Sequence, residues 1–409
     1  MQELLGPEAE EFLVAMDKSP VTSVRLNNRK PGAGFPGATR VKWCDSGFYL
    51  PERPQFVLDP LLHAGAYYVQ DASSMIYQTL AEIIAGQLKK NNLKVLDLCA
   101  APGGKTTAMI NGLPDGADIV ANEISVKRVG ALRENLCKWG YRPVKVTNRD
   151  SYSFAEEGVI YDIVAVDAPC SGEGMMRKDE DARSQWSPAL IAQCAALQKE
   201  ILSNAVQTLK PGGFLIYSTC TFNREENELN AEFIKNNLGL VPFDPEFPVE
   251  WGIMNGLGTD LPVYRFMPHH TNGEGLFVAV FKKNIDAGFS EGSVPDKNLF
   301  PRAKNDLKDR NGKDKKARKN FTPKTKELDV IPEIDRILEI GYNDEKYPKV
   351  ELSLEEARCY LRRESLRLSR DIPAGIIIVT YKGLPLGPAK NIGSRINNLY
   401  PKAWRVLQR

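Results

Sequence analysis

The sequence predicts an α/β fold: a mainly parallel sheet with helices on both faces, followed by a smaller folded unit. Between residues 94 and 236, short apolar runs alternate with helical segments, which is the pattern of a parallel sheet covered on both sides. Two further apolar runs, at residues 263–266 and 276–281, predict a hairpin that adds an antiparallel edge. The 409 residues, 42% hydrophobic and 26% charged, are enough for two or three globular domains.

Residues 1–70 predict a small α+β module. A helical start at residues 7–16 precedes a short strand at residues 22–27. After a stretch rich in proline and glycine, residues 41–43 and 47–50 alternate like two small strands.

Residues 71–283 predict the main sheet and its helices. The first helix ends near residue 85 and has Ser73 or Asp71 as its N-cap. Gly140 ends a later helix, and residues 210–213 predict a turn. The other expected elements are strands at 94–98, 118–122, 144–147, 161–166 and 214–218, and helices from 105 and at 125–139, 188–209 and 225–236.

Residues 284–326 predict a flexible basic linker. Residues 302–319 carry nine Lys and Arg against three Asp, without an apolar cluster that could pack. Such a segment is either a solvated tether or a contact to a nucleic-acid backbone, and the two roles are compatible.

Residues 327–409 predict a second folded unit. Ser353 and Glu356 form a capping box before a helix at residues 357–368, and residues 374–381 predict a strand. Gly383 and Gly387 mark turns. Basic residues interleaved with aromatic ones toward residue 409 suit either RNA contact or an ordinary small β-rich core.

Composition excludes several classes of protein. The seven cysteines are odd in number and widely spaced, which favours free thiols over a disulfide framework. The adjacent His269 and His270 have no cysteine nearby, so we expect no metal site. No run of eighteen apolar residues occurs, and the first residues lack the features of a signal peptide. We therefore expect a cytoplasmic protein, monomeric and without membrane contact.

A glycine-rich turn follows the strand at residues 94–98 and leads into a helix. Glycines allow a ligand close to the backbone, and free helix N–H groups attract an acceptor. The turn is not a P-loop, because Cys99 occupies the place of the first P-loop glycine; a dehydrogenase fingerprint is also missing. Glu123 follows the next strand, at an offset that suits a ribose, and Asp150 follows the third and could bind an adenine amino group. A nucleoside-containing cofactor is expected here.

Two cysteines each follow a predicted buried strand. Cys170 comes after Asp167-Ala168-Pro169, and Cys220 comes after Ser218-Thr219. Because ligands bind outside the carboxyl ends of parallel strands, the two thiols are expected to face one pocket. A thiolate there could add to C6 of a cytosine and make C5 nucleophilic toward a methyl donor, while Asp167 hydrogen-bonds N3 or the exocyclic amine.

Residues 99–106, 167–172 and 218–221 resemble the motifs of RNA 5-methylcytosine methyltransferases of the NOL1/NOP2/Sun family, as do residues 67–75 upstream. The resemblance extends over residues 20–283. Residues 172–179, the basic linker and the C-terminal unit are similar to the branch that modifies small-subunit ribosomal RNA.

The resemblance implies a class I (Rossmann-like) S-adenosylmethionine-dependent methyltransferase sheet and a C-terminal PUA-like RNA-binding domain. It implies that Cys220 is the nucleophile and that Cys170 assists product release. Many members carry Asp where this chain has Glu123, whose longer arm still reaches a ribose. The residues implied to bind S-adenosylmethionine are Cys99, Ala100, Ala101, Pro102, Gly103, Gly104, Lys105, Glu123, Arg128, Asp150 and Asp167.

The expected substrate is 16S ribosomal RNA, free or in the small ribosomal subunit. The same chemistry on tRNA is an alternative, and so is a non-catalytic assembly factor, against which the intact Asp167, Cys170 and Cys220 argue. A thiol redox enzyme would need a C-x-x-C pair, which is missing.

Overall fold

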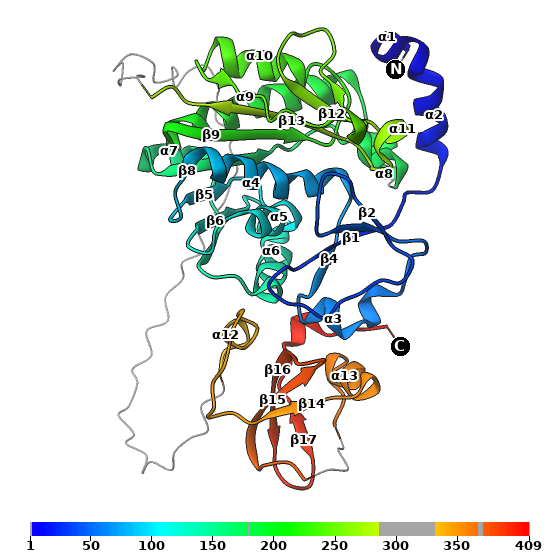
Figure 1. The fold of residues 1–409 in the computed structure, drawn as a ribbon, viewed down its shortest axis with the longest axis vertical. Coiled ribbons are helices and arrows are strands. Elements are labelled where there is room, and N and C mark those ends of the chain that lie inside the picture. Colours follow the sequence, from blue (N-terminus) through cyan, green and yellow to red (C-terminus); the bar gives the residue numbers. More distant parts are fainter. Residues whose placement is uncertain (1, 179, 286–331, 367–370, 409) are drawn as a thin grey trace, which may run out of the picture.

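A computed structural model describes residues 2–178, 180–285, 332–366 and 371–408, and it contains three sheets (Figure 1). The predicted linker at residues 284–326 lies almost entirely outside the described residues. The predicted α/β class, with an N-terminal module, a central sheet and a C-terminal unit, is confirmed.

The N-terminal module is a four-stranded antiparallel sheet with short helices. Its strand order is β2-β3-β1-β4. Its elements are α1 (Gln2–Leu5), α2 (Ala9–Asp17), β1 (Ser23–Leu26), β2 (Thr39–Arg40), β3 (Gly47–Tyr49), α3 (Pro60–His63) and β4 (Tyr67–Val69).

The central sheet has nine strands in the order β11-β12-β13-β9-β8-β5-β6-β7, with β10 paired to β13. Strands β7, β6, β5, β8 and β9 are parallel, and β13, β12 and β11 close the sheet antiparallel. The strands are β5 (Lys94–Asp97), β6 (Asp118–Asn122), β7 (Val144–Thr147), β8 (Tyr161–Asp167), β9 (Leu209–Thr219), β10 (Val241–Pro242), β11 (Met254–Asn255), β12 (Val263–Phe266) and β13 (Leu276–Lys282). The helices are α4 (Ile76–Leu88), α5 (Gly104–Gly112), α6 (Val126–Trp139), α7 (Ser151–Glu157), α8 (Glu180–Gln185), α9 (Pro188–Thr208), α10 (Glu228–Asn236) and α11 (Pro268–Thr271).

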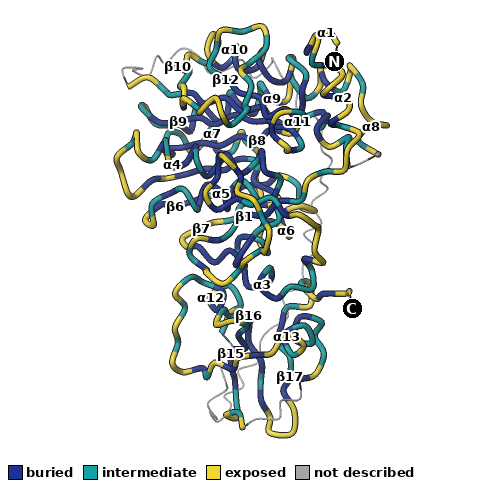
Figure 2. Tube along the Cα trace, turned by 45° about the vertical axis from the view of Figure 1, so that its right-hand side comes forward, coloured by how far each residue is buried: buried dark blue, intermediate teal, exposed yellow. Residues whose placement is uncertain are grey.

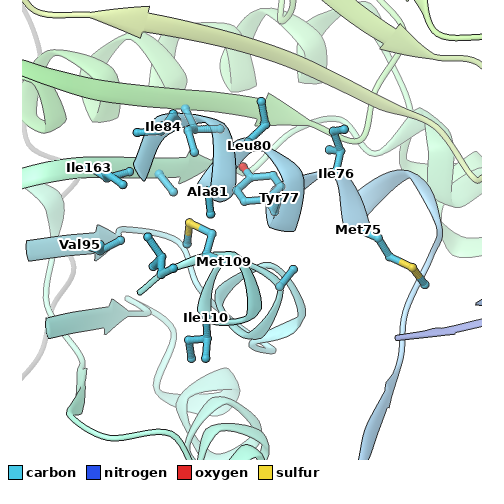
Figure 3. Packing of buried hydrophobic residues seen from close by; sticks show 14 of the residues in the cluster. Met75, Ile76, Tyr77, Leu80, Ala81, Ile84, Val95, Met109, Ile110 and Ile163 are labelled. Carbon is cyan, nitrogen blue, oxygen red and sulfur yellow. The ribbon is translucent and has the colours of Figure 1, made fainter. Parts of the chain in front are cut away.

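Two hydrophobic cores lie on opposite faces of this sheet. Alternate residues of a strand serve different cores: Val95 packs with α4 and α5, whereas Leu96 packs with α7, α9 and α10. On the first face, Tyr77 and Ala81 of α4 lie against Met109 of α5 (Figure 3). The result is a three-layer arrangement whose strand ends are held at fixed positions.

The C-terminal unit is a four-stranded sheet in the order β14-β15-β16-β17, and it lies next to α3 of the N-terminal module (Figure 1). Its elements are α12 (Ile334–Ile337), β14 (Lys349–Glu351), α13 (Leu354–Leu361), β15 (Gly375–Tyr381), β16 (Leu384–Asn391) and β17 (Ile396–Asn398). Ala64, which directly follows α3, is buried within the core of this unit. Figure 2 shows buried chain both at α3 and in the neighbouring strand β16.

Several predicted details were wrong. Residues 41–43 form a turn, because Val41 and Trp43 turn inward into the core and the strand lies at β2 instead. Residues 210–213 are paired as the first part of β9, through hydrogen bonds between Gly212, Gly213 and Lys283.

Other differences concern the ends of elements. Of the two proposed N-caps, Asp71 accepts a hydrogen bond from Ser74 N at 3.3 Å, whereas Ser73 lies inside a 3-10 turn. Helix α13 ends at Leu361, well before residue 368, and Gly387 lies within β16. Helix α7 was not predicted.

A buried lysine ties the three parts of the chain together. The Lys30 ammonium donates hydrogen bonds to three backbone carbonyls, those of Ala64 (3.0 Å), Lys138 (2.7 Å) and Leu338 (2.7 Å). Burial lowers the pKa of Lys30 to about 7, because no carboxylate among the described residues pairs with it. Gly140, at φ +78°, completes this junction, since a Cβ there would lie 2.2 Å from the Leu338 oxygen.

We predict that Lys30→Met lowers the free energy of unfolding by about 2 kcal/mol, because three buried carbonyls lose their donor. The matched control is Lys42→Met, since Lys42 is exposed and donates to a single carbonyl, that of Glu250. The control should change stability by less than ~0.5 kcal/mol. Urea denaturation of the full chain measures both. Equal midpoints for Lys30→Met and the wild type would contradict the prediction.

Candidate active site

The two cysteines at the strand ends face each other. Strands β8 and β9 are parallel neighbours in a register that pairs Asp167 with Ser218, so the residues that follow each strand come to the same edge. The Sγ atoms of Cys170 and Cys220 are 3.2 Å apart, and both cysteines are free thiols. The structure therefore brings together the two thiols that the sequence singled out.

The contact makes the two thiols unequal. The hydrogen bond from Cys170 is the main cause that lowers the pKa of Cys220, and the Lys105 ammonium contributes, although burial and Asp167 oppose it. The same hydrogen bond, together with burial, holds the pKa of Cys170 well above its usual value. The contact therefore favours ionisation of Cys220 over ionisation of Cys170.

Asp167 and Lys105 form an ion pair beside the thiols. The Lys105 Nζ atom lies 2.8 Å from Asp167 Oδ2, and Ser218 Oγ donates to Asp167 Oδ1 at 2.7 Å. Burial alone would lower the pKa of Lys105, but the Asp167 carboxylate outweighs it and raises this pKa. Because Lys105 belongs to α5 and Asp167 to β8, the pair connects the glycine-rich turn to the thiols.

The glycine-rich turn, residues 99–105, runs from β5 into α5. Gly103 takes φ +105° at the helix N-cap position, and no side chain of the described residues caps this helix. The backbone is fixed instead by a hydrogen bond from Ala100 N to Asn122 O at 2.7 Å. Burial raises the pKa of the Cys99 thiol, which makes it a weaker acid than Cys220.

Glu123 directly follows β6, and only one of its two carboxylate oxygens accepts a hydrogen bond from the described residues. Its Oε1 atom accepts from Ser125 N at 2.8 Å. Its Oε2 atom is buried and accepts no hydrogen bond from the described residues, although Arg128 Nη1 lies 3.2 Å away. Arg128 also donates to the Ala101 carbonyl of the turn. A buried carboxylate oxygen without a hydrogen-bond donor suits the hydroxyl of a ribose.

Asp150 has a structural role that was not predicted from the sequence. It is the N-cap of α7, where its Oδ1 atom accepts from Ser153 N at 2.8 Å. The residue still follows β7 at the same edge of the sheet as Glu123.

Sequence reasoning missed two buried carboxylates that join the cysteine loops. Glu226 accepts from Ser171 N (3.0 Å), the residue after Cys170, and from Gln198 Nε2 (2.7 Å). Glu173 accepts from Thr221 Oγ1 (2.7 Å), the residue after Cys220, and from Phe222 N (2.7 Å). Ser171 lies 55 positions before Glu226, and Thr221 lies 48 positions after Glu173, so no local pattern signals these contacts.

A third missed acid lies beneath the turn. Asp97 at the end of β5 is buried and accepts from Thr106 Oγ1 at 2.6 Å. Burial raises the pKa of Asp97 to about 7.

No helix within the described ranges is long and apolar enough to span a bilayer.

Three family models match successive parts of the chain. They are described as the N-terminal domain of 16S rRNA methyltransferase RsmF (residues 1–72), 16S rRNA methyltransferase RsmB/F (85–282) and the methyltransferase RsmF PUA domain (347–406).

Relatives named ribosomal RNA small subunit methyltransferase F match nearly the whole chain. The protein from Klebsiella pneumoniae (strain 342) is 31% identical over 96% of this chain and 92% of its own length. The protein from Erwinia tasmaniensis is 31% identical over 98% of this chain and 94% of its own.

Solved structures share the fold. A methyltransferase homolog from Pyrococcus horikoshii has a TM-score of 0.58 and 27% identity over 69% of this chain and 92% of its own. NSun6 from the same organism, solved with the S-adenosylmethionine analogue SFG, has a TM-score of 0.58 and 21% identity over 69% of this chain and 96% of its own.

We predict that Cys170→Ala raises the pKa of Cys220, because the variant removes the thiol that donates to the Cys220 thiolate. Alkylation of Cys220 by iodoacetamide, followed across pH by mass spectrometry, should then have its midpoint at higher pH. Cys194→Ala is the control, since Cys194 lies on α9 outside this contact. An unchanged midpoint in Cys170→Ala, or the same shift in the control, would show that the thiol contact does not set this pKa.

Proposed function

The chain belongs to the RsmB/F family of 16S rRNA methyltransferases, and we propose that it methylates C5 of a cytosine in 16S ribosomal RNA through a covalent Cys220–C6 adduct. The observation that carries the proposal is the Cys170–Cys220 contact of 3.2 Å, in which Cys220 has the lowered pKa. The names of the relatives support ribosomal RNA of the small subunit as the substrate. The pair of Cys170 and Cys220 supports the reaction through a covalent adduct.

The cofactor is S-adenosylmethionine, which supplies an electrophilic methyl group when bound. The residues of this chain fit it: Glu123 offers a buried acceptor for a ribose hydroxyl, and the start of α5 offers uncapped N–H groups to a carboxylate. The turn residues 99–105, together with Arg128, Asp150 and Asp167, complete the proposed binding set.

Cys220 starts the reaction. Its thiolate forms a bond to C6 of the cytosine, and the electron pair displaced from the C5–C6 double bond makes C5 nucleophilic. Cytosine presents a donor at its exocyclic amine and an acceptor at N3. Asp167 and Lys105 offer the matching acceptor and donor, and the Lys105 ammonium stabilises the charge that develops at N3.

Cys170 completes the reaction. The hydrogen bond to Cys220 is the largest cause that raises the pKa of Cys170, and it is lost once Cys220 is bound to carbon, although burial still raises this pKa. Cys170 can then lose its proton to solvent and remove the C5 proton of the methylated ring. The electrons of the broken C5–H bond restore the C5–C6 double bond, the C6–S bond breaks, and Cys220 leaves as a thiolate.

We predict that Cys220→Ala lowers methyl transfer to unmodified 16S rRNA by at least ~1,000-fold, because the ring is no longer activated. Transfer is measured with radiolabelled S-adenosylmethionine on 16S rRNA, assembled small subunits and tRNA in parallel. Cofactor affinity, measured by calorimetry, should stay unchanged, and Cys194→Ala should keep full activity. Wild-type turnover in Cys220→Ala would show that Cys220 is not the nucleophile. Methyl transfer to tRNA alone would show that 16S rRNA is not the substrate.

We predict that Cys170→Ala accumulates a protein–RNA adduct that survives denaturation, because Cys220 still adds to C6 but the C5 proton is not removed. A denaturing gel with labelled RNA detects the adduct. The double variant Cys170→Ala/Cys220→Ala is the control and should give no adduct. If the single variant gives none either, Cys170 has no part in product release.

A further inference from the structure

Outside the active site, one acidic and two histidine side chains meet at a single point. Glu8 lies in the 3-10 turn before α2, and His269 and His270 are consecutive residues of α11. We propose that Glu8, His269 and His270 form a binding site for a divalent transition-metal ion of the zinc class. Glu8 is separated from His269 by 261 positions in the sequence and from His270 by 262.

The distances suit coordination of one ion. Glu8 Oε2 lies 3.2 Å from His269 Nε2 and 3.1 Å from His270 Nε2, and all three atoms lie within 4.8 Å of one another. Bonds of about 2.0–2.2 Å in a tetrahedral site place ligand atoms roughly 3.3 Å apart. An ion therefore needs only small side-chain movements, and its fourth position is left to water.

The cluster offers two imidazole nitrogens and one carboxylate oxygen. The two Nε2 atoms share hydrogens with Glu8 Oε2, and an ion bound through these three atoms takes the place of those hydrogens. Nitrogen and carboxylate donors together favour zinc over magnesium or calcium, which prefer oxygen alone.

The site is open on one side and anchored on the other. The His269 side chain is 3% exposed, whereas those of His270 and Glu8 are 34% and 45% exposed. The His269 Nδ1 atom is buried without a partner among the described residues, so the polar contact of this ring within the cluster is made by its Nε2 atom, with Glu8. An ion can enter from solvent and reach a preformed ligand.

A bound ion would fasten α2 over the chain that follows Cys220. Phe12 of α2 packs edge-on against Phe222 at 5.0 Å and against His269 at 5.7 Å between ring centres. Phe222 lies two residues after Cys220 and is held by Glu173. The proposed role is therefore structural: the metal closes the N-terminal segment onto the support of the catalytic loop. The expectation of no metal site rested on the absence of a cysteine near His269 and His270, and Glu8 lies too far away in sequence to be recognised as their partner.

Titration of the tag-free full chain with Zn²⁺ and Co²⁺ tests the proposal. We expect saturable binding of one ion and a rise in Tm of roughly 5 °C at a hundredfold excess over Kd. Bound Co²⁺ should have a tetrahedral absorption spectrum without a thiolate charge-transfer band. Methylation is not the readout, so the result is independent of the proposed reaction.

Glu8→Gln and His270→Gln change exposed ligands and should weaken binding at least ~10-fold without loss of the fold, which circular dichroism checks. Glu10→Gln is the control, since Glu10 is exposed on the same helical segment and outside the cluster. No saturable binding, equal affinity in the ligand variants, or a thiolate band for Co²⁺ would each overturn the proposal.

Discussion

The proposed chemistry depends on one hydrogen bond between two sulfur atoms. The Cys170–Cys220 contact exists because β8 and β9 are parallel neighbours whose ends lie in register. The contact lowers the pKa of Cys220 and raises that of Cys170, so the two thiols of the pair differ in acidity, as the proposed roles of nucleophile and proton donor require. The ion pair of Lys105 and Asp167 adds a donor and an acceptor beside the two thiols.

The rest of the site holds this contact in place. Glu226 and Glu173 each accept hydrogen bonds that link the Cys170 loop to the chain around Cys220, and both carboxylates are buried. Gly174 approaches the Cys220 carbonyl so closely that an added Cβ would lie 2.7 Å from its oxygen. Burying charge is costly unless it is fully hydrogen-bonded, and these acids meet that condition.

Much of the central sheet followed from the sequence, because short apolar runs alternate clearly with helical segments and local patterns report such elements. The placement of Cys170 and Cys220 at one edge also followed, since parallel strands end together. What local patterns could not give are contacts between distant residues. Lys30 with Leu338 and Glu8 with His269 are examples, because their partners lie far away in sequence. Residues 41–43 were mistaken for a strand because tertiary burial of Trp43 overrode local alternation.

The most direct test replaces the C5 hydrogen of the substrate by fluorine, which cannot leave as a proton. Target RNA containing 5-fluorocytidine is incubated with the protein and S-adenosylmethionine, then digested, and the linked peptide is sequenced by mass spectrometry. The account predicts a nucleotide attached to the Cys220 sulfur, because the thioether at C6 persists when elimination is blocked. Attachment to Cys170 or to another residue, or no attachment at all, would contradict it.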